Sequence, residues 1–129
     1  MDAKRKTQLI AVVDDDESVR TALGGALNSV GLKTRSFASA EEFWDSEQRS
    51  RTACLITDIQ MPGMSGLELQ SALAEENSRI PIIFITAYGD PKMRMQAMRA
   101  GAVEFLGKPF DDEVLLKSVR AALETGIEK

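Results

Sequence analysis

The chain has 129 residues, of which 43% are hydrophobic and 28% are charged, and its net charge is -4. This length and composition indicate one globular domain that needs no disulfide or structural metal to fold. The acidic balance argues against direct binding to nucleic acid or to an anionic membrane. Because histidine is absent, histidine-based catalysis, histidine-ligated zinc and phosphohistidine on this chain are excluded.

The ends of the chain are predicted to lie outside the folded domain, which spans residues 9–125. Residues 1–8 carry a short basic run and are expected to form a solvated leader, and residues 126–129 form a C-terminal tail. The apolar run that follows the leader is too short for a signal peptide or a membrane span. The single cysteine, Cys54, lies in an apolar run and is predicted to be a buried, inert thiol, so a reducing cytoplasm is the expected location.

Five short apolar runs predict β-strands. Most of them lack an alternation of apolar and polar residues, which is typical of strands covered on both faces in a parallel sheet. The predicted strands are Leu9–Val13, Leu32–Phe37, Cys54–Thr57, Ile82–Ile85 and Val103–Leu106.

Helical patterns with start and stop signals lie between these strands. A row of apolar residues at helical spacing runs from Val19 to Val30, and Gly31 is expected to end that helix. Ser39 and Ser65 each stand three residues before a glutamate, which is the capping-box pattern.

Two further helices are predicted in the second half of the chain. Asp90 before Pro91 indicates a helix start, and Gly101 can close that helix. The last helix is expected to begin near Asp111. Its predicted buried residues are Leu115, Val119 and Ala122.

This alternation of strands and helices predicts an α/β fold with right-handed crossovers. Five such units favour a doubly wound parallel sheet in the strand order 2-1-3-4-5 with five helices. In such sheets, ligands bind outside the carboxyl ends of the strands.

Polar side chains follow four of the predicted strands at those carboxyl ends. Asp14 and Asp15 follow the first strand, Asp58 the third, Thr86 the fourth and Lys108 the fifth. Repulsion among three carboxylates in one cleft predicts raised pKa values unless cations compensate. Lys108 supplies one positive charge, and a site of few carboxylates plus waters suits Mg²⁺. These groups predict phosphoryl transfer, with a carboxylate as the nucleophile.

Four signatures, in order along the chain, resemble those of two-component response-regulator receiver domains. They are Val-Val-Asp-Asp at 12–15, Thr-Asp-Ile-Gln-Met-Pro-Gly-Met-Ser-Gly at 57–66, Ile-Thr-Ala at 85–87 and Gly-Lys-Pro-Phe at 107–110. The resemblance covers residues 8–124 and implies the flavodoxin-like receiver fold. Within that family the sequence is most similar to the FixJ-like transcriptional regulators.

The resemblance implies a role for each acidic residue. By position, Asp58 matches the phosphoryl acceptor, which takes its group from a sensor histidine kinase. Asp15 matches a direct Mg²⁺ ligand, with Asp14 acting mostly through water, and Asp58 and the backbone carbonyl of Gln60 complete the implied protein ligands.

The resemblance also implies a conformational switch. Thr86 matches the hydroxyl that moves to a phosphoryl oxygen, Lys108 the cation that pairs with the phosphoryl group, and Phe105 the aromatic residue that turns inward as the threonine moves. The Lys108–Pro109 peptide is implied to be cis. Tyr88, two residues after the threonine, stands where phosphoryl lifetime is tuned in the family.

The output is implied to leave through the fourth helix and the fifth strand. Phosphorylation is expected to promote homodimerisation there, and to control transcription through a DNA-binding domain absent from this chain. The chain is therefore expected to be a receiver cut from a longer regulator. A stand-alone receiver that docks on partners is the alternative.

Enzyme and cofactor-binding alternatives are disfavoured. A haloacid-dehalogenase-like phosphatase needs a carboxylate two residues after its nucleophile, where this chain has Gln60. A flavodoxin-like FMN carrier needs a phosphate loop after the first strand, where Asp14 to Asp16 would repel the phosphate. A degenerate receiver is disfavoured because no site residue is missing. We therefore expect a signalling switch that assists its own phosphorylation and dephosphorylation rather than an enzyme.

Overall fold

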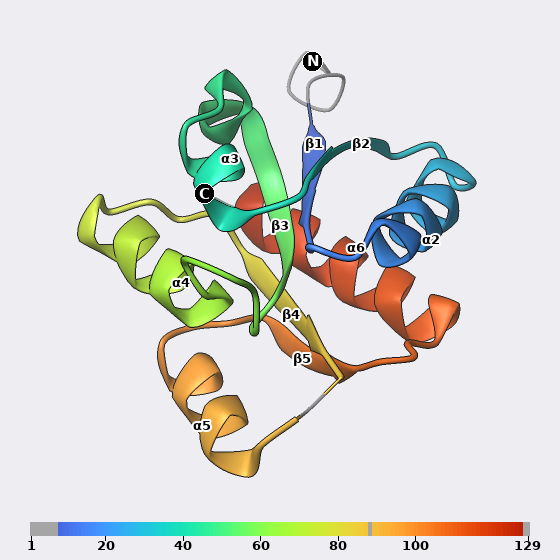
Figure 1. Cartoon of the computed structure of the whole chain (residues 1–129). Helices are drawn as coiled ribbons and strands as arrows, with labels where there is room; N and C mark the ends of the chain where they lie inside the picture. The colour runs from blue at the N-terminus through green and yellow to red at the C-terminus, as the bar shows by residue number, and fades with distance from the viewer. Residues whose placement is uncertain (1–7, 88, 128–129) are drawn as a thin grey trace.

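The protein folds around one parallel sheet, as seen in a computed structural model that describes residues 8–87 and 89–127 (Figure 1). Tyr88, residues 1–7 of the predicted leader and residues 128–129 of the predicted tail lie outside the described residues. In chain order the elements are β1 (Leu9–Val13), α2 (Glu17–Asn28), β2 (Lys33–Phe37), α3 (Ala40–Trp44), the 3-10 helix η1 (Glu47–Arg51), β3 (Thr52–Asp58), α4 (Gly66–Glu75), β4 (Ile82–Thr86), α5 (Pro91–Arg99), β5 (Glu104–Gly107) and α6 (Asp112–Ile127).

The five strands pair in the order β2-β1-β3-β4-β5, and every pairing is parallel. The predicted α/β fold class and strand order are therefore confirmed. Each predicted strand is present: β1 has the predicted bounds, and the bounds of the other four differ by one or two residues. The clearest difference is β3, which begins at Thr52 and includes Asp58 as its last residue. The short helix η1 was not predicted.

Two apolar clusters cover the two faces of the sheet, because successive strand residues point to opposite sides. Ala11, Val13 and Phe84 face a cluster that α3, α4 and α5 complete. Ile10, Val12 and Ile83 face a second cluster that α2 and α6 complete. Figure 1 shows these two groups of helices on opposite sides of the sheet. The absence of alternation in the strand sequences is explained by this double cover.

Cys54 belongs to the second cluster and is fully buried. Its burial raises the pKa of the thiol to about 12, so the thiol is protonated at neutral pH. The predicted burial of this cysteine is confirmed.

The apolar face of α2 ends earlier along the chain than predicted. Leu23 and Leu27 are fully buried, whereas Val30 lies beyond the end of the helix and is 42% exposed. The chain turns at Gly31, whose φ of 85° is the left-handed conformation that glycine adopts without strain. The prediction that Gly31 ends this segment is confirmed. The last helix buries all three of its predicted residues, Leu115, Val119 and Ala122.

Side-chain caps begin the helices at the carboxyl edge of the sheet. The capping box at Ser65 and Glu68 is complete. At Ser39 it is half-formed, because the Glu42 carboxylate accepts from the N–H of Ala38 instead of the N-cap N–H. Asp90 caps α5 as predicted, with Pro91 at the first helical position. These caps fix where each strand-to-helix loop ends, and the site is built from those loops.

Candidate functional site

Three carboxylates meet at the carboxyl edge of the sheet. Asp14 and Asp15 follow β1, Asp58 ends the neighbouring strand β3, and their oxygen atoms lie within 4.8 Å of one another. Asp14 is 1% exposed and Asp58 is 7% exposed, whereas Asp15 is exposed to solvent. The predicted convergence of these three residues is confirmed.

Lys108 supplies the positive charge that the sequence predicted for this cluster. Its Nζ lies 2.9 Å from Oδ2 of Asp14 and 2.9 Å from Oδ2 of Asp58. Burial lowers the pKa of Lys108, but hydrogen bonds and attraction from Asp58 and Asp14 outweigh burial and leave the pKa raised. The ammonium group therefore stays charged at neutral pH and bridges the two buried carboxylates.

The pKa of Asp14 is raised, as predicted, but the main cause differs from the one expected. Burial makes the largest contribution, because it takes the carboxylate out of water, and the charge of Asp58 is the smallest of the causes. Hydrogen bonds from the N–H of Asp16 and from Lys108 oppose this rise. Desolvation rather than repulsion is thus the dominant effect on Asp14.

Asp16 has a structural role. It is the N-cap of α2, and its carboxylate accepts hydrogen bonds from the N–H and the hydroxyl of Ser18 at 2.9 and 2.7 Å. These bonds lower its pKa. The acidic run after β1 therefore divides into two residues in the cluster and one helix cap.

The other predicted site residues line the same edge. Thr86 is 1% exposed at the end of β4, and its carbonyl accepts from the N–H of Lys108 at 2.9 Å. The N–H of Gln60, in the β3–α4 loop, donates to Oδ1 of Asp58 at 3.2 Å. The Lys108–Pro109 peptide is cis, as the resemblance implied.

Phe105 lies inward on β5 and is 7% exposed. Its ring centroid is 6.4 Å from that of Phe84, and the guanidinium carbon of Arg94 lies 5.9 Å from the same centroid. Arg94 also donates to the carbonyl of Phe105 at 3.3 Å. Arg94 is therefore bonded to β5 of its own chain.

Three residues hold the loops of the site and were given no role in the sequence analysis. Arg20 on α2 donates to the carbonyl oxygen of Asp14 at 2.6 Å. Glu41 on α3 accepts from the N–H of Met64 in the β3–α4 loop at 2.8 Å. Gly66 lies so close to β3 that a Cβ there would be 2.2 Å from the carbonyl oxygen of Asp58. Of these three residues, only Gly66 falls within a matched signature, the one at 57–66.

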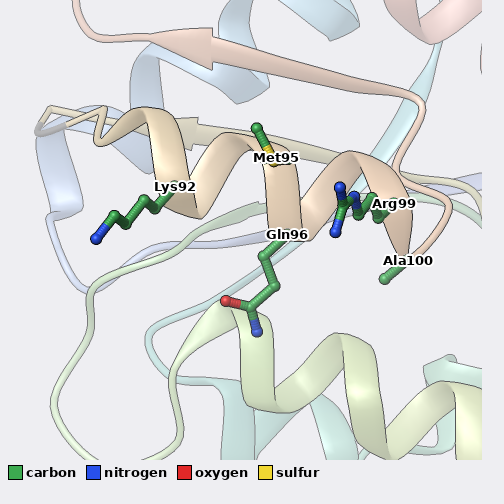
Figure 2. Close-up of a pocket in the computed structure, with 5 residues that line it drawn as sticks. All are labelled: Lys92, Met95, Gln96, Arg99 and Ala100. Atoms are coloured by element: carbon green, nitrogen blue, oxygen red, sulfur yellow. The ribbon is translucent and has the colours of Figure 1, made fainter.

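The outer face of α5 carries a surface pocket. Met95 in its wall is 55% exposed, which is unusual for a large apolar side chain. Figure 2 shows Met95 and Gln96 projecting to opposite sides of the helix. The lining residues are Lys92, Met95, Gln96, Arg99 and Ala100. Met93 and Met98 pack partly into the core instead, so the methionines of this helix divide between two environments.

Comparison with known proteins shows which family this chain resembles. The family model of the response regulator receiver domain matches residues 10–120. The chain is 48% identical over 116 residues to nodulation protein W of Bradyrhizobium diazoefficiens, covering 90% of this chain and 51% of that protein. The chain thus spans about half the length of this curated relative. In the described part of the chain, no helix is long and apolar enough to cross a membrane.

Solved structures agree with the family match. The response regulator StyR superposes with a TM-score of 0.87 at 44% identity, covering 94% of this chain and 61% of that one. The structure named FixJ-N superposes with a TM-score of 0.82 at 39% identity, covering 91% and 94%. The phosphatase and FMN-carrier alternatives are not favoured by these matches. Receiver domains are signalling switches of two-component systems, and they occur in transcriptional regulators such as FixJ. On the strength of the family match, the chain belongs to the response-regulator receiver domains.

Proposed function

We propose that Asp58 accepts a phosphoryl group from the phosphohistidine of a sensor histidine kinase. An oxygen of the Asp58 carboxylate forms a bond to phosphorus, and the bond between phosphorus and the kinase histidine nitrogen breaks. The product is an aspartyl phosphate and a neutral kinase histidine. The observation that carries this proposal is the cluster of three carboxylates within 4.8 Å, with one lysine bonded to two of them.

The donor set of this cluster fits Mg²⁺. Carboxylate oxygens are the ligands that this hard cation prefers, and the exposed Asp15 leaves one side of the cluster open to water. Asp14, Asp15 and Asp58 would hold the ion, with the carbonyl of Gln60 as a further proposed ligand. When bound, the ion neutralises charge on phosphoryl oxygens.

Lys108 and Thr86 are the proposed partners of the phosphoryl group. Lys108 already lies 2.9 Å from Oδ2 of Asp58, so its ammonium can pair with an oxygen of the new group without a large movement. Thr86 lies at the end of the next strand, where its hydroxyl can donate to a second oxygen. Phe105, which packs beneath this edge, would follow the threonine and pass the change to α5 and β5. By these contacts the domain would assist its own phosphorylation and dephosphorylation.

The wider role follows from the family. We propose that residues 9–125 act as the receiver of a cytoplasmic regulator, and that a DNA-binding domain outside this chain carries the transcriptional output. Direct binding of this domain to nucleic acid or membrane is not part of the proposal, in line with its net charge of -4.

Acetyl phosphate should add one phosphoryl group to the purified chain when Mg²⁺ is present. Intact-mass spectrometry measures the adduct in Mg²⁺ and in chelator, for the wild type and for Asp58→Asn. We expect no adduct in chelator, and none in the variant because an amide is a poor nucleophile. An adduct of equal yield in Asp58→Asn would contradict the assignment of Asp58.

A beryllofluoride mimic of the phosphoryl group should promote homodimers through α5 and β5. The exposed Met95 in the pocket of α5 is the proposed apolar anchor, because buried apolar contacts at the centre of an interface contribute most of its stability. Sedimentation velocity with and without the mimic measures the change. We expect Met95→Glu to remain monomeric in both conditions, because the carboxylate would have to be buried without a partner.

Val30 provides the control for this experiment. It is also exposed, but it follows α2 on the opposite side of the sheet, so Val30→Glu should dimerise like the wild type. A wild-type chain that stays monomeric with the mimic at high concentration would favour the stand-alone, partner-docking receiver.

A further inference from the structure

One arginine on α2 reaches back to the loop that carries two of the clustered carboxylates. Arg20 is partly buried and donates from Nη1 to the backbone carbonyl oxygen of Asp14 at 2.6 Å. Arg20 lies in the first turn of α2, four residues after the N-cap Asp16. The contact therefore joins the rigid start of a helix to the end of β1.

The Asp14 carbonyl belongs to the peptide group that joins Asp14 to Asp15. Because a peptide group is planar, a hydrogen bond that holds its oxygen also fixes the direction in which Asp15 leaves the strand. The next residue is held as well, since the N–H of Asp16 donates to Oδ1 of Asp14 at 2.9 Å. Within residues 8–87 and 89–127, the exposed Asp15 carboxylate itself has no hydrogen bond or ion pair that would orient it. Its placement depends on the backbone.

We infer that Arg20 is a positioning residue for the metal site. Its hydrogen bond to the Asp14 carbonyl holds the β1–α2 loop so that the Asp15 carboxylate faces Asp14 and Asp58 before an ion binds. This inference rests on the proposed function, which assigns Mg²⁺ to that cluster. Residues that orient metal ligands from outside typically change metal affinity by about 10–100-fold when they are replaced.

The positive charge of Arg20 alone predicts the opposite effect. A guanidinium near the cluster repels a divalent cation, so its removal would tighten Mg²⁺ binding if charge were all that mattered. Loss of the hydrogen bond weakens binding instead, because the loop then has to be ordered when the ion binds. The direction of the change in affinity therefore distinguishes positioning from electrostatics.

Isothermal titration of Mg²⁺ into the full chain tests the inference. We expect the Kd for Mg²⁺ to rise about 10-fold in Arg20→Met, and less in Arg20→Lys, whose ammonium can still donate one hydrogen bond. Arg120→Ala removes the same charge from an exposed position on α6 and should leave the Kd unchanged. The melting temperature in chelator should differ little between the wild type and Arg20→Met, because the inference concerns ligand placement and not the core.

An unchanged or lower Kd in Arg20→Met overturns the inference while leaving the proposed function intact. A wild-type chain that does not bind Mg²⁺ overturns both, so the two failures are distinguishable. Circular dichroism shows whether Arg20→Met folds. If it does not, Arg20→Gln replaces it, because the shorter amide cannot span the same distance, and the same rise in Kd is expected.

Discussion

Replacing Gly66 with alanine should destabilise the domain and slow the labelling of Asp58. A Cβ at this position would lie 2.2 Å from the carbonyl oxygen of Asp58, a distance that real Cβ atoms essentially never show. It would also lie 3.0 Å from Cα of Ile59, which is a tight contact. The N–H of Gly66 also donates to the carbonyl of Ile59 at 2.9 Å, so the helix start and the strand end cannot separate freely. Overpacking of this kind costs about 1–3 kcal/mol.

The rate of labelling should fall by a larger factor than the loss of unfolding free energy alone would give, because the displaced atoms belong to Asp58, the acceptor residue itself. A shift of about 1 Å in a reacting group can reduce a rate by roughly 100-fold. Denaturant unfolding gives the first effect, and the initial rate of labelling by acetyl phosphate gives the second. Both are compared between the wild type and Gly66→Ala.

Gly25 is the matched control for this prediction. It lies within α2, and a Cβ there would meet no atom within 4 Å. Gly25→Ala should therefore stabilise the protein by up to about 1 kcal/mol, through helix propensity alone, with labelling unchanged. Equal stability and equal labelling in Gly66→Ala and the wild type would contradict the close approach of α4 to β3.

Replacing Lys108 with alanine should reduce stability in chelator and strengthen the response to Mg²⁺. The ammonium is the counter-charge of two buried carboxylates, Asp14 and Asp58, and its loss leaves each with a backbone N–H donor but no positively charged partner. Leaving charged groups unpaired at such a partly buried site costs about 2–3 kcal/mol. The Oδ2 atoms that Lys108 occupied also become free, and a competing cation is removed.

The pH range of this effect follows from the pKa of Lys108. Because that pKa is raised above its ordinary value of 10.5 in the folded protein, the stabilising contribution is fully present at neutral pH. It is lost only as the pH rises through the folded value. Comparison of wild type and Lys108→Ala at neutral pH therefore measures the whole contribution.

Melting curves with and without Mg²⁺ give both parts of the Lys108 prediction. We expect Lys108→Ala to melt lower than the wild type in chelator and to gain more from Mg²⁺. Lys117→Ala, which removes an exposed lysine from α6, should match the wild type in both conditions. If Lys108→Ala were as stable as the wild type in chelator, the bridging role of the ammonium would be wrong.

The sheet and its order could be predicted because buried parallel strands are continuous apolar runs with short, capped connections. The helix starts at Ser65 and Asp90 could also be predicted, because a capping side chain is visible in the sequence. The helix η1 was missed because its five residues, Glu47–Arg51, include no apolar side chain. The sequence pattern assigns Val30 to the apolar face of the helix, because its spacing continues the apolar row. The residue is exposed because α2 ends before it.

The candidate site likewise has features that the sequence predicts and features that it does not. Asp14, Asp58 and Lys108 could be predicted to meet because each follows a strand at one edge of the sheet. The contacts of Arg20 and Glu41 could not, since each joins a side chain to the backbone of a separate loop. Such contacts depend on the exact placement of helices on the sheet, and no spacing rule describes that placement. The dominance of desolvation at Asp14 likewise required its burial to be known.

Mapping the phosphorylated residue tests the central claim most directly. After acetyl phosphate treatment in Mg²⁺, borohydride reduces an aspartyl phosphate to homoserine, and peptide mass spectrometry locates the reduced residue. The account predicts reduction at Asp58 alone, none in chelator, and none after Asp58→Asn. Reduction at Asp14 or Asp15 in the wild type, or full labelling in chelator, would contradict it.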